Sequence, residues 1–134
     1  MDITIDQLVK LLVSVLCGGI IGWERYKNHK AAGFRTMILV CLGSTLIMML
    51  SQDYLSGDML RIVAGIVTGI GFLGAGAIFA TKGNIHGITT AASIWVVAAI
   101  GMTVGVGAYL LSIIVTILTF VILELGFIEK RFKN

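Results

Sequence analysis

Residues 83–123 read GNIHGITTAASIWVVAAIGMTVGVGAYLLSIIVTILTFVIL and include no Asp, Glu, Lys or Arg. A helix needs about 20 mostly apolar residues to cross about 30 Å of hydrocarbon at about 1.5 Å per residue. The stretch has about twice that length, so it contains two membrane crossings. Gly101, Gly105 and Gly107 mark the expected turn between them. We therefore predict a fourth span near Ile88–Val104 and a fifth near Ala108–Leu125.

Three further apolar stretches precede this one, and they run from Ile5 to Trp23, from Gly33 to Gln52 and from Ile62 to Ala80. Of the 134 residues, 57% are apolar and 13% are charged, and the mean hydropathy is +1.01. Soluble proteins carry about 25% charged residues. We predict an all-α, polytopic membrane protein with five transmembrane helices. We expect residues 1–134 to form a single transmembrane domain with no soluble C-terminal domain.

The distribution of cations predicts how the chain is oriented. With the amino terminus outside, only Lys10 and Arg61 fall on the outer side. Lys and Arg near helix ends are retained on the cytoplasmic side, so the carboxyl terminus is expected in the cytoplasm. Because the cations are confined to short segments between apolar runs, they do not form the basic face that nucleic-acid binding requires. The inner side then holds the other eight cations: Arg25, Lys27, Lys30, Arg35, Lys82, Lys130, Arg131 and Lys133.

Glycines in the first and third apolar stretches predict close helix packing. The segment GIGFLGAG, residues 69–76, contains a literal G-x-G-x-x-G pattern. A dinucleotide site would need a preceding strand and an acid about twenty residues further on, and both are missing, so we set that interpretation aside. Small residues four apart let membrane helices approach closely, and we expect the third span to be the most buried. The predicted packing glycines are Gly18, Gly22, Gly65, Gly69, Gly71 and Gly74.

Two polar segments between spans fall on the predicted cytoplasmic side, ERYKNHKAAGFRT (24–36) and TKGNIHGITT (81–90). The second and fourth spans begin there, and the free N–H groups at helix amino termini favour anions. A phosphate, a lipid headgroup or an acidic partner segment fits this layer. The alternative is that its cations only anchor the chain at the membrane surface. The predicted functional polar layer comprises Glu24, Arg25, Arg35, Thr36, Asn84, Thr89 and Thr90.

Glu24 ends the first predicted span and is followed by a cationic segment. We predict an ion pair with Arg35 that holds the first two helices together, in preference to metal ligation, because one acid beside four cations suits a divalent ion poorly. No cofactor is predicted. If a magnesium ion binds, its candidate ligands are Glu24, Asn84 and Thr90. No nucleophile, base or metal set can be assembled, so we do not expect an enzyme.

Three segments of the chain strongly resemble the MgtC/SapB family of bacterial inner-membrane proteins. They are GWERYKNHKAAGFRTMILVCLGS (22–44), RIVAGIVTGIGFLGAGAIF (61–79) and GNIHGITTAASIWVVAAIGMTVGVG (83–107). The resemblance implies five transmembrane helices in the bacterial inner membrane. Some members carry a cytoplasmic ACT-type domain, and this chain resembles the short, membrane-only branch. Some relatives have Asn at the position of Thr89 and Cys at that of Val96, so functions tied to those side chains are not carried over.

The family resemblance implies a link to magnesium limitation, acid tolerance and intracellular survival, and certain members are credited with a regulatory contact to the F-type ATP synthase. Our first hypothesis is a small membrane regulator, a homodimer, whose cytoplasmic polar layer contacts a membrane-protein partner or an ionic ligand. The alternative is an oligomeric transporter or channel for magnesium or another cation. The position of Glu24 discriminates between them: a water-filled axis between protomers favours transport, and an ion pair within one protomer favours regulation.

Overall fold

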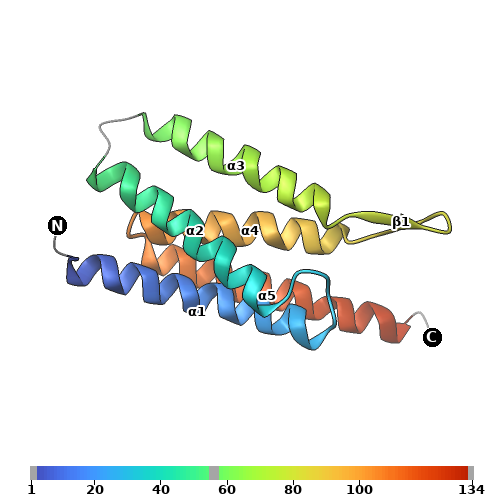
Figure 1. Cartoon of the computed structure of the whole chain (residues 1–134). Coiled ribbons are helices and arrows are strands. Elements are labelled where there is room, and N and C mark those ends of the chain that lie inside the picture. Colours follow the sequence, from blue (N-terminus) through green and yellow to red (C-terminus); the bar gives the residue numbers. More distant parts are fainter. Residues whose placement is uncertain (1–2, 55–57, 133–134) are drawn as a thin grey trace.

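The computed structural model describes residues 3–54 and 58–132, and this part of the chain contains five long helices (Figure 1). Each has a segment long and apolar enough to cross a membrane. Every predicted span overlaps one of them, which confirms the all-α, five-span prediction. The orientation of the termini stays a prediction. The helices are α1 (Ile5–Lys27), α2 (Phe34–Asp53), α3 (Met59–Gly76), α4 (Ile88–Gly105) and α5 (Tyr109–Phe132).

Successive helices run in alternating directions, and α4 lies at the centre of the bundle (Figure 1). It contacts all four other helices, and the most extensive contact of the bundle joins α1 to α2. The largest buried share belongs to α4 and the smallest to α3. The prediction that the third span is the most buried was therefore wrong, because α3 packs on one side against α4 and makes little contact with α2.

Four glycines bring α1 and α4 close to α2. A Cβ added at Gly18 would lie 2.8 Å from the Met37 carbonyl oxygen, and one at Gly22 would lie 2.7 Å from Phe34 Cα. Gly101 and Gly105 approach α2 just as closely from α4. Gly18 and Gly22, two of the predicted packing glycines, thus lie directly against α2. Of the three glycines expected to mark a turn, Gly101 lies inside α4, Gly105 is the last residue of that helix, and Gly107, with φ of 81°, lies in the turn between α4 and α5.

Three of the four glycines predicted to pack in α3 have nothing opposite them among the residues that the structure describes. A Cβ at Gly65, Gly69 or Gly71 would meet no atom within 4 Å, whereas one at Gly74 would contact Ala91 of α4 at 3.7 Å. The packing prediction was thus wrong for the first three residues within the single chain. The physical reason is the placement of α3, whose described residues pack on α4 through its carboxyl-terminal end, where Gly74 lies.

A short β-hairpin joins α3 to α4 and projects beyond the ends of the helices (Figure 1). Its strands, β1 (Phe79–Thr81) and β2 (Asn84–His86), pair antiparallel with Phe79 opposite His86. The turn residues Lys82 and Gly83 both have positive φ, 50° and 81°. This is the requirement of the two-residue type I′ turn. We call this end of the bundle, which also carries the α1–α2 loop, the hairpin end.

Polar contacts at the opposite end tie three helices together. Asp6 forms an ion pair with Lys10 at 3.0 Å and accepts a hydrogen bond from the Tyr109 hydroxyl of α5 at 2.9 Å. The side-chain amide of Gln7 donates to Asp53 of α2 at 2.8 Å. These bonds fix the start of α1 against the end of α2 and the start of α5.

Candidate functional site

Glu24 and Arg25 form a buried ion pair near the hairpin end of α1. Glu24 is 1% exposed and Arg25 is 2% exposed. Arg25 donates from Nε to Glu24 Oε2 and from Nη2 to Oε1, the latter at 2.6 Å. The side-chain amide of Asn28 donates to the same Oε1 at 2.8 Å. Glu24 therefore has its hydrogen-bond partners within its own helix and the residue that caps it.

The predicted ion pair between Glu24 and Arg35 was wrong. Because α1 continues to Lys27, Glu24 and Arg25 belong to the helix instead of beginning the loop. The long guanidinium of Arg25 reaches back to its neighbour, whereas Arg35 is exposed in the first turn of α2. Nη1 of Arg25 is buried and makes no hydrogen bond to the part of the chain that is described.

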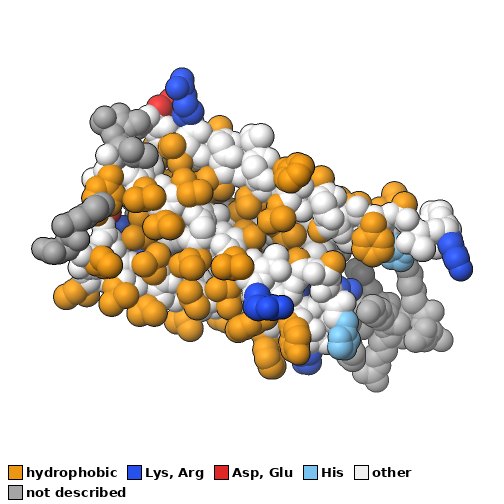
Figure 2. Space-filling view, in the orientation of Figure 1, with side chains coloured by type: hydrophobic (Ala, Val, Ile, Leu, Met, Phe, Trp, Pro, Cys, Tyr) orange, Lys and Arg blue, Asp and Glu red, His pale blue; other side chains and the backbone are white. Residues whose placement is uncertain are grey.

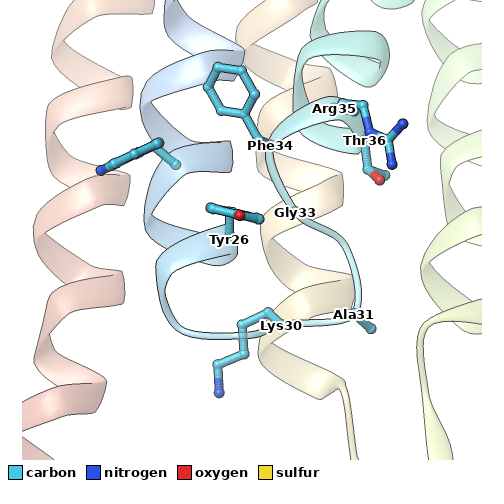
Figure 3. A pocket seen from close by; sticks show the side chains of 8 residues that line it. Tyr26, Lys30, Ala31, Gly33, Phe34, Arg35 and Thr36 are labelled. Carbon is cyan, nitrogen blue, oxygen red and sulfur yellow. The ribbon is translucent and has the colours of Figure 1, made fainter.

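Arg35 and Thr36 line a cavity of about 460 Å³ beside the α1–α2 loop, which we call the loop pocket. Figure 3 shows Lys30 at the bend of the loop, with Arg35 and Thr36 at the start of α2. The N-cap of α2 is Gly33, which offers no side-chain hydrogen bond to the first turn. Aromatic side chains complete the lining: Trp23, Tyr26 and Phe34.

Thr89 and Thr90 line a second cavity of about 660 Å³, which we call the hairpin-end pocket. It lies between the α1–α2 loop, the hairpin and the start of α4, and its lining includes His29 and His86. Gly87 precedes α4 with φ of 90°, so the chain turns sharply from the hairpin into the helix there. Thr90 is buried, whereas Thr89 is exposed.

The predicted polar layer is thus divided among four places. Glu24 and Arg25 are buried inside the bundle, Arg35 and Thr36 line the loop pocket, and Thr89 and Thr90 line the hairpin-end pocket. Asn84 is exposed in β2 and lines neither pocket. Lys30 and Ala31 line both pockets and connect them. The expected single layer was wrong in this respect, because Glu24 and Arg25 turn inward while their neighbours in the loop turn outward.

The three candidate magnesium ligands do not converge in the described part of the molecule. Glu24 is engaged by Arg25 and Asn28, and Asn84 is exposed in β2. The hairpin-end pocket is lined by Thr90 but by neither of the other two. Within the same described residues, no three His, Cys, Asp or Glu side chains gather in one place.

The sequence analysis missed the hairpin and its exposed apolar side chains. Phe79 and Ile85 are 54% and 65% exposed, and the Phe79 ring stacks on His86 with centroids 5.4 Å apart. The sequence signal for the hairpin was weak, since Gly83 suits a turn position with positive φ but Lys-Gly is not among the dipeptides typical of two-residue hairpin turns. It was overlooked because strands of three residues are too short to show an alternating pattern.

The family model described as the MgtC family matches residues 11–131. The chain belongs to the MgtC family. YhiD of Escherichia coli K12, provisionally named a magnesium transporter, is 42% identical over 130 residues, which cover 90% of this chain and 60% of YhiD. Protein MgtC of Brucella abortus is 47% identical over 94 residues, or 69% of this chain and 39% of that protein.

SrpB of Synechococcus elongatus is 36% identical over 141 aligned positions, which cover 93% of this chain and 75% of SrpB. The chain thus spans at most about 60% of the length of YhiD and of the Brucella protein. No solved structure matches it. The predicted family is confirmed, and with five potential spans the chain is a bacterial multi-pass membrane protein.

Proposed function

We propose that this protein is a small membrane regulator linked to magnesium homeostasis and to adaptation to low magnesium or acid stress. It acts through a hairpin-end surface that comprises the α1–α2 loop, the hairpin and the start of α4. The link to magnesium comes from the family and from the provisional name of YhiD. The inner membrane is the proposed location, with the hairpin end in the cytoplasm because it holds Arg25, Lys27, Lys30, Arg35 and Lys82.

The burial of Glu24 and the bonds of its carboxylate within one chain are the observation that favours regulation over transport. A cation path through a membrane protein requires polar or acidic groups that face water along the path. Glu24 is 1% exposed, and its carboxylate is bonded to Arg25 and Asn28 of the same chain. Opening it toward a passing ion would break these bonds and leave a buried guanidinium without its counter-charge, which is costly.

The chemistry of the hairpin-end surface fits a protein partner. Phe79 and Ile85 expose apolar side chains on a hairpin that extends beyond the helices, with Lys82 at its tip. Exposed apolar groups surrounded by polar ones are typical of protein contacts. The hairpin-end pocket beside the hairpin and the loop pocket beside the α1–α2 loop offer recesses for side chains of a membrane-protein partner.

The first test measures magnesium flux into proteoliposomes that contain the full chain and an internal magnesium-sensitive dye. We expect the flux to equal that of empty vesicles, under both membrane polarities, and to be the same for a Glu24→Gln, Asn84→Ala variant. Flux above the empty-vesicle level that falls in this variant would establish the alternative, an oligomeric magnesium transporter, and would overturn the regulator.

The second test measures growth at low magnesium in a bacterial host whose own MgtC-family gene is deleted and whose growth the full chain restores. We expect Ile85→Asp to abolish restoration, because a charge on the hairpin opposes an apolar contact. Ile3→Asp is the matched control, since Ile3 is 76% exposed at the opposite end. Equal growth of both variants, at equal membrane levels, would exclude the hairpin as the contact surface.

A further inference from the structure

A groove with a cavity volume of about 460 Å³ lies between α2 and α3, two helices that make little direct contact. Gly43 of α2 and Gly65 and Gly69 of α3 line it, and a Cβ at any of the three would meet no atom within 4 Å. Most of the remaining lining is aliphatic, and Arg61 is its charged member. The volume is in the range of about 300–1,000 Å³ that is typical of ligand sites.

The groove has the length and polarity of one membrane leaflet. Its α3 lining extends from Arg61 to Ile70, nine residues apart, which is about 14 Å along a helix. Half the hydrocarbon thickness of a bilayer is about 15 Å. Arg61 follows the start of α3 by two residues, at the end of the bundle opposite the hairpin. Figure 2 shows an apolar belt with charged side chains gathered toward the two ends of the helices.

Arg61 lacks an anionic partner among the residues that the structure describes, where the ion pairs are Lys10 with Asp6 and Arg25 with Glu24. The described acids at this end are already engaged. Asp6 binds Lys10 and Tyr109, Asp53 accepts a hydrogen bond from Gln7, and Asp58 caps α3 by accepting from the Leu60 N–H at 3.0 Å. Arg61 is exposed and makes no ion pair with a described residue, so its guanidinium is available to a lipid phosphate.

We propose that this groove binds one acyl chain of an anionic phospholipid whose phosphate pairs with Arg61. The phosphate lies at the depth where α3 begins, and the guanidinium binds it by charge-assisted hydrogen bonds. The acyl chain passes over Gly65 and Gly69, where the missing side chains leave room for it. This site lies at the end of the bundle opposite the hairpin-end surface, so it is independent of the proposed function.

The test titrates the purified full chain in detergent with phosphatidylglycerol and, separately, with phosphatidylcholine of the same acyl chains, and native mass spectrometry measures the bound lipid. Both headgroups contain a phosphate, but the choline ammonium offsets its charge in phosphatidylcholine. We expect the net anion phosphatidylglycerol to bind about tenfold more tightly, because its attraction to Arg61 is not offset in this way. Arg61→Gln should abolish this preference. Gly65→Leu should fill the groove and weaken both lipids about tenfold or more.

The control is Gly71→Leu, the same substitution on the same helix at a position that is equally open but does not line the groove. Its lipid binding should equal that of the unmodified chain. Helical content and melting temperature check that the variants fold. The proposal is overturned if Arg61→Gln keeps the lipid preference or if the two leucine variants behave alike. It is also overturned if Gly65→Leu changes a dimer into a monomer without changing lipid binding, because the occupant would then be a second copy.

Discussion

Two sets of glycines in this molecule have the same spacing and opposite surroundings. Gly18 and Gly22 of α1, like Gly101 and Gly105 of α4, stand four residues apart and lie against α2. Gly65 and Gly69 of α3 also stand four apart, and in the described part of the chain no atom would lie within 4 Å of a Cβ at either position. Glycine spacing therefore makes a helix able to approach another one closely, and the facing element decides whether it does. We call α1, α2 and α4 the packed helices and compare them with α3.

The packed helices also hold buried polar side chains, whereas the buried residues of α3 are Ile66 and Gly74. Thr45 of α2 donates a hydrogen bond to the Gly101 carbonyl of α4 at 2.8 Å, and α1 contains the buried pair of Glu24 and Arg25. On α3, the Thr68 hydroxyl bonds to the Ala64 carbonyl of its own helix. The bond of Thr45 depends on close approach, because a short distance between α2 and α4 brings its hydroxyl to the neighbouring backbone.

The largest effect in this comparison is expected from Arg25→Ala. The substitution removes the counter-charge of a carboxylate that is 1% exposed, and breaking a buried pair in this way costs about 3–5 kcal/mol. We expect the free energy of unfolding, measured by SDS titration in mixed micelles, to fall by that amount. Arg35→Ala is the control, since Arg35 is exposed and a surface substitution changes stability by about 0.5 kcal/mol or less. Equal losses for both variants would contradict the assignment of Glu24 to Arg25.

The five spans were predictable from the sequence because hydrocarbon thickness sets a length that an apolar run either has or lacks. The uncharged stretch of residues 83–123 gave two spans without further information, and α4 and α5 lie where the pattern placed them. The partner of Glu24 was not predictable in the same way. Whether its helix ends at Trp23 or continues to Lys27 decides between Arg35 and Arg25, and helix ends are uncertain by several residues in a sequence.

The second-largest loss in the free energy of unfolding is expected from Gly101→Leu. This substitution places a side chain against the Cys41 carbonyl and Ser44 Cβ of α2. Overpacking of this kind costs about 1–3 kcal/mol, and the same SDS titration measures it. Gly71→Leu is the matched control, and we expect a change of about 0.5 kcal/mol or less because a Cβ there meets nothing. A greater loss for Gly71→Leu would show that α3, and not α4, is the tightly packed helix.

Which glycines pack was not predictable, because a single sequence gives periodicity within a helix but not which helix lies opposite. Gly65 and Gly69 satisfy the small-residue pattern as well as Gly18 and Gly22 do. The candidate site was predictable to the level of segments, since the α1–α2 loop lines both pockets at the hairpin end and the hairpin region lines one of them. Its division into separate pockets follows from side-chain directions that the sequence does not specify.

The smallest effect is expected from Thr45→Val, which keeps the size of the side chain and removes the hydrogen bond from α2 to the Gly101 carbonyl. Hydrogen bonds between membrane helices contribute about 0.6 kcal/mol on average, and we expect this loss in the SDS titration. Thr68→Val on α3 removes a bond within one exposed helix, so its free energy of unfolding should stay within error of the unmodified protein. Because both hydroxyls donate to a backbone carbonyl at 2.8 Å, a difference between the variants isolates what the helix contact adds. Equal values would mean that the close approach of α4 to α2 is stabilised by packing alone.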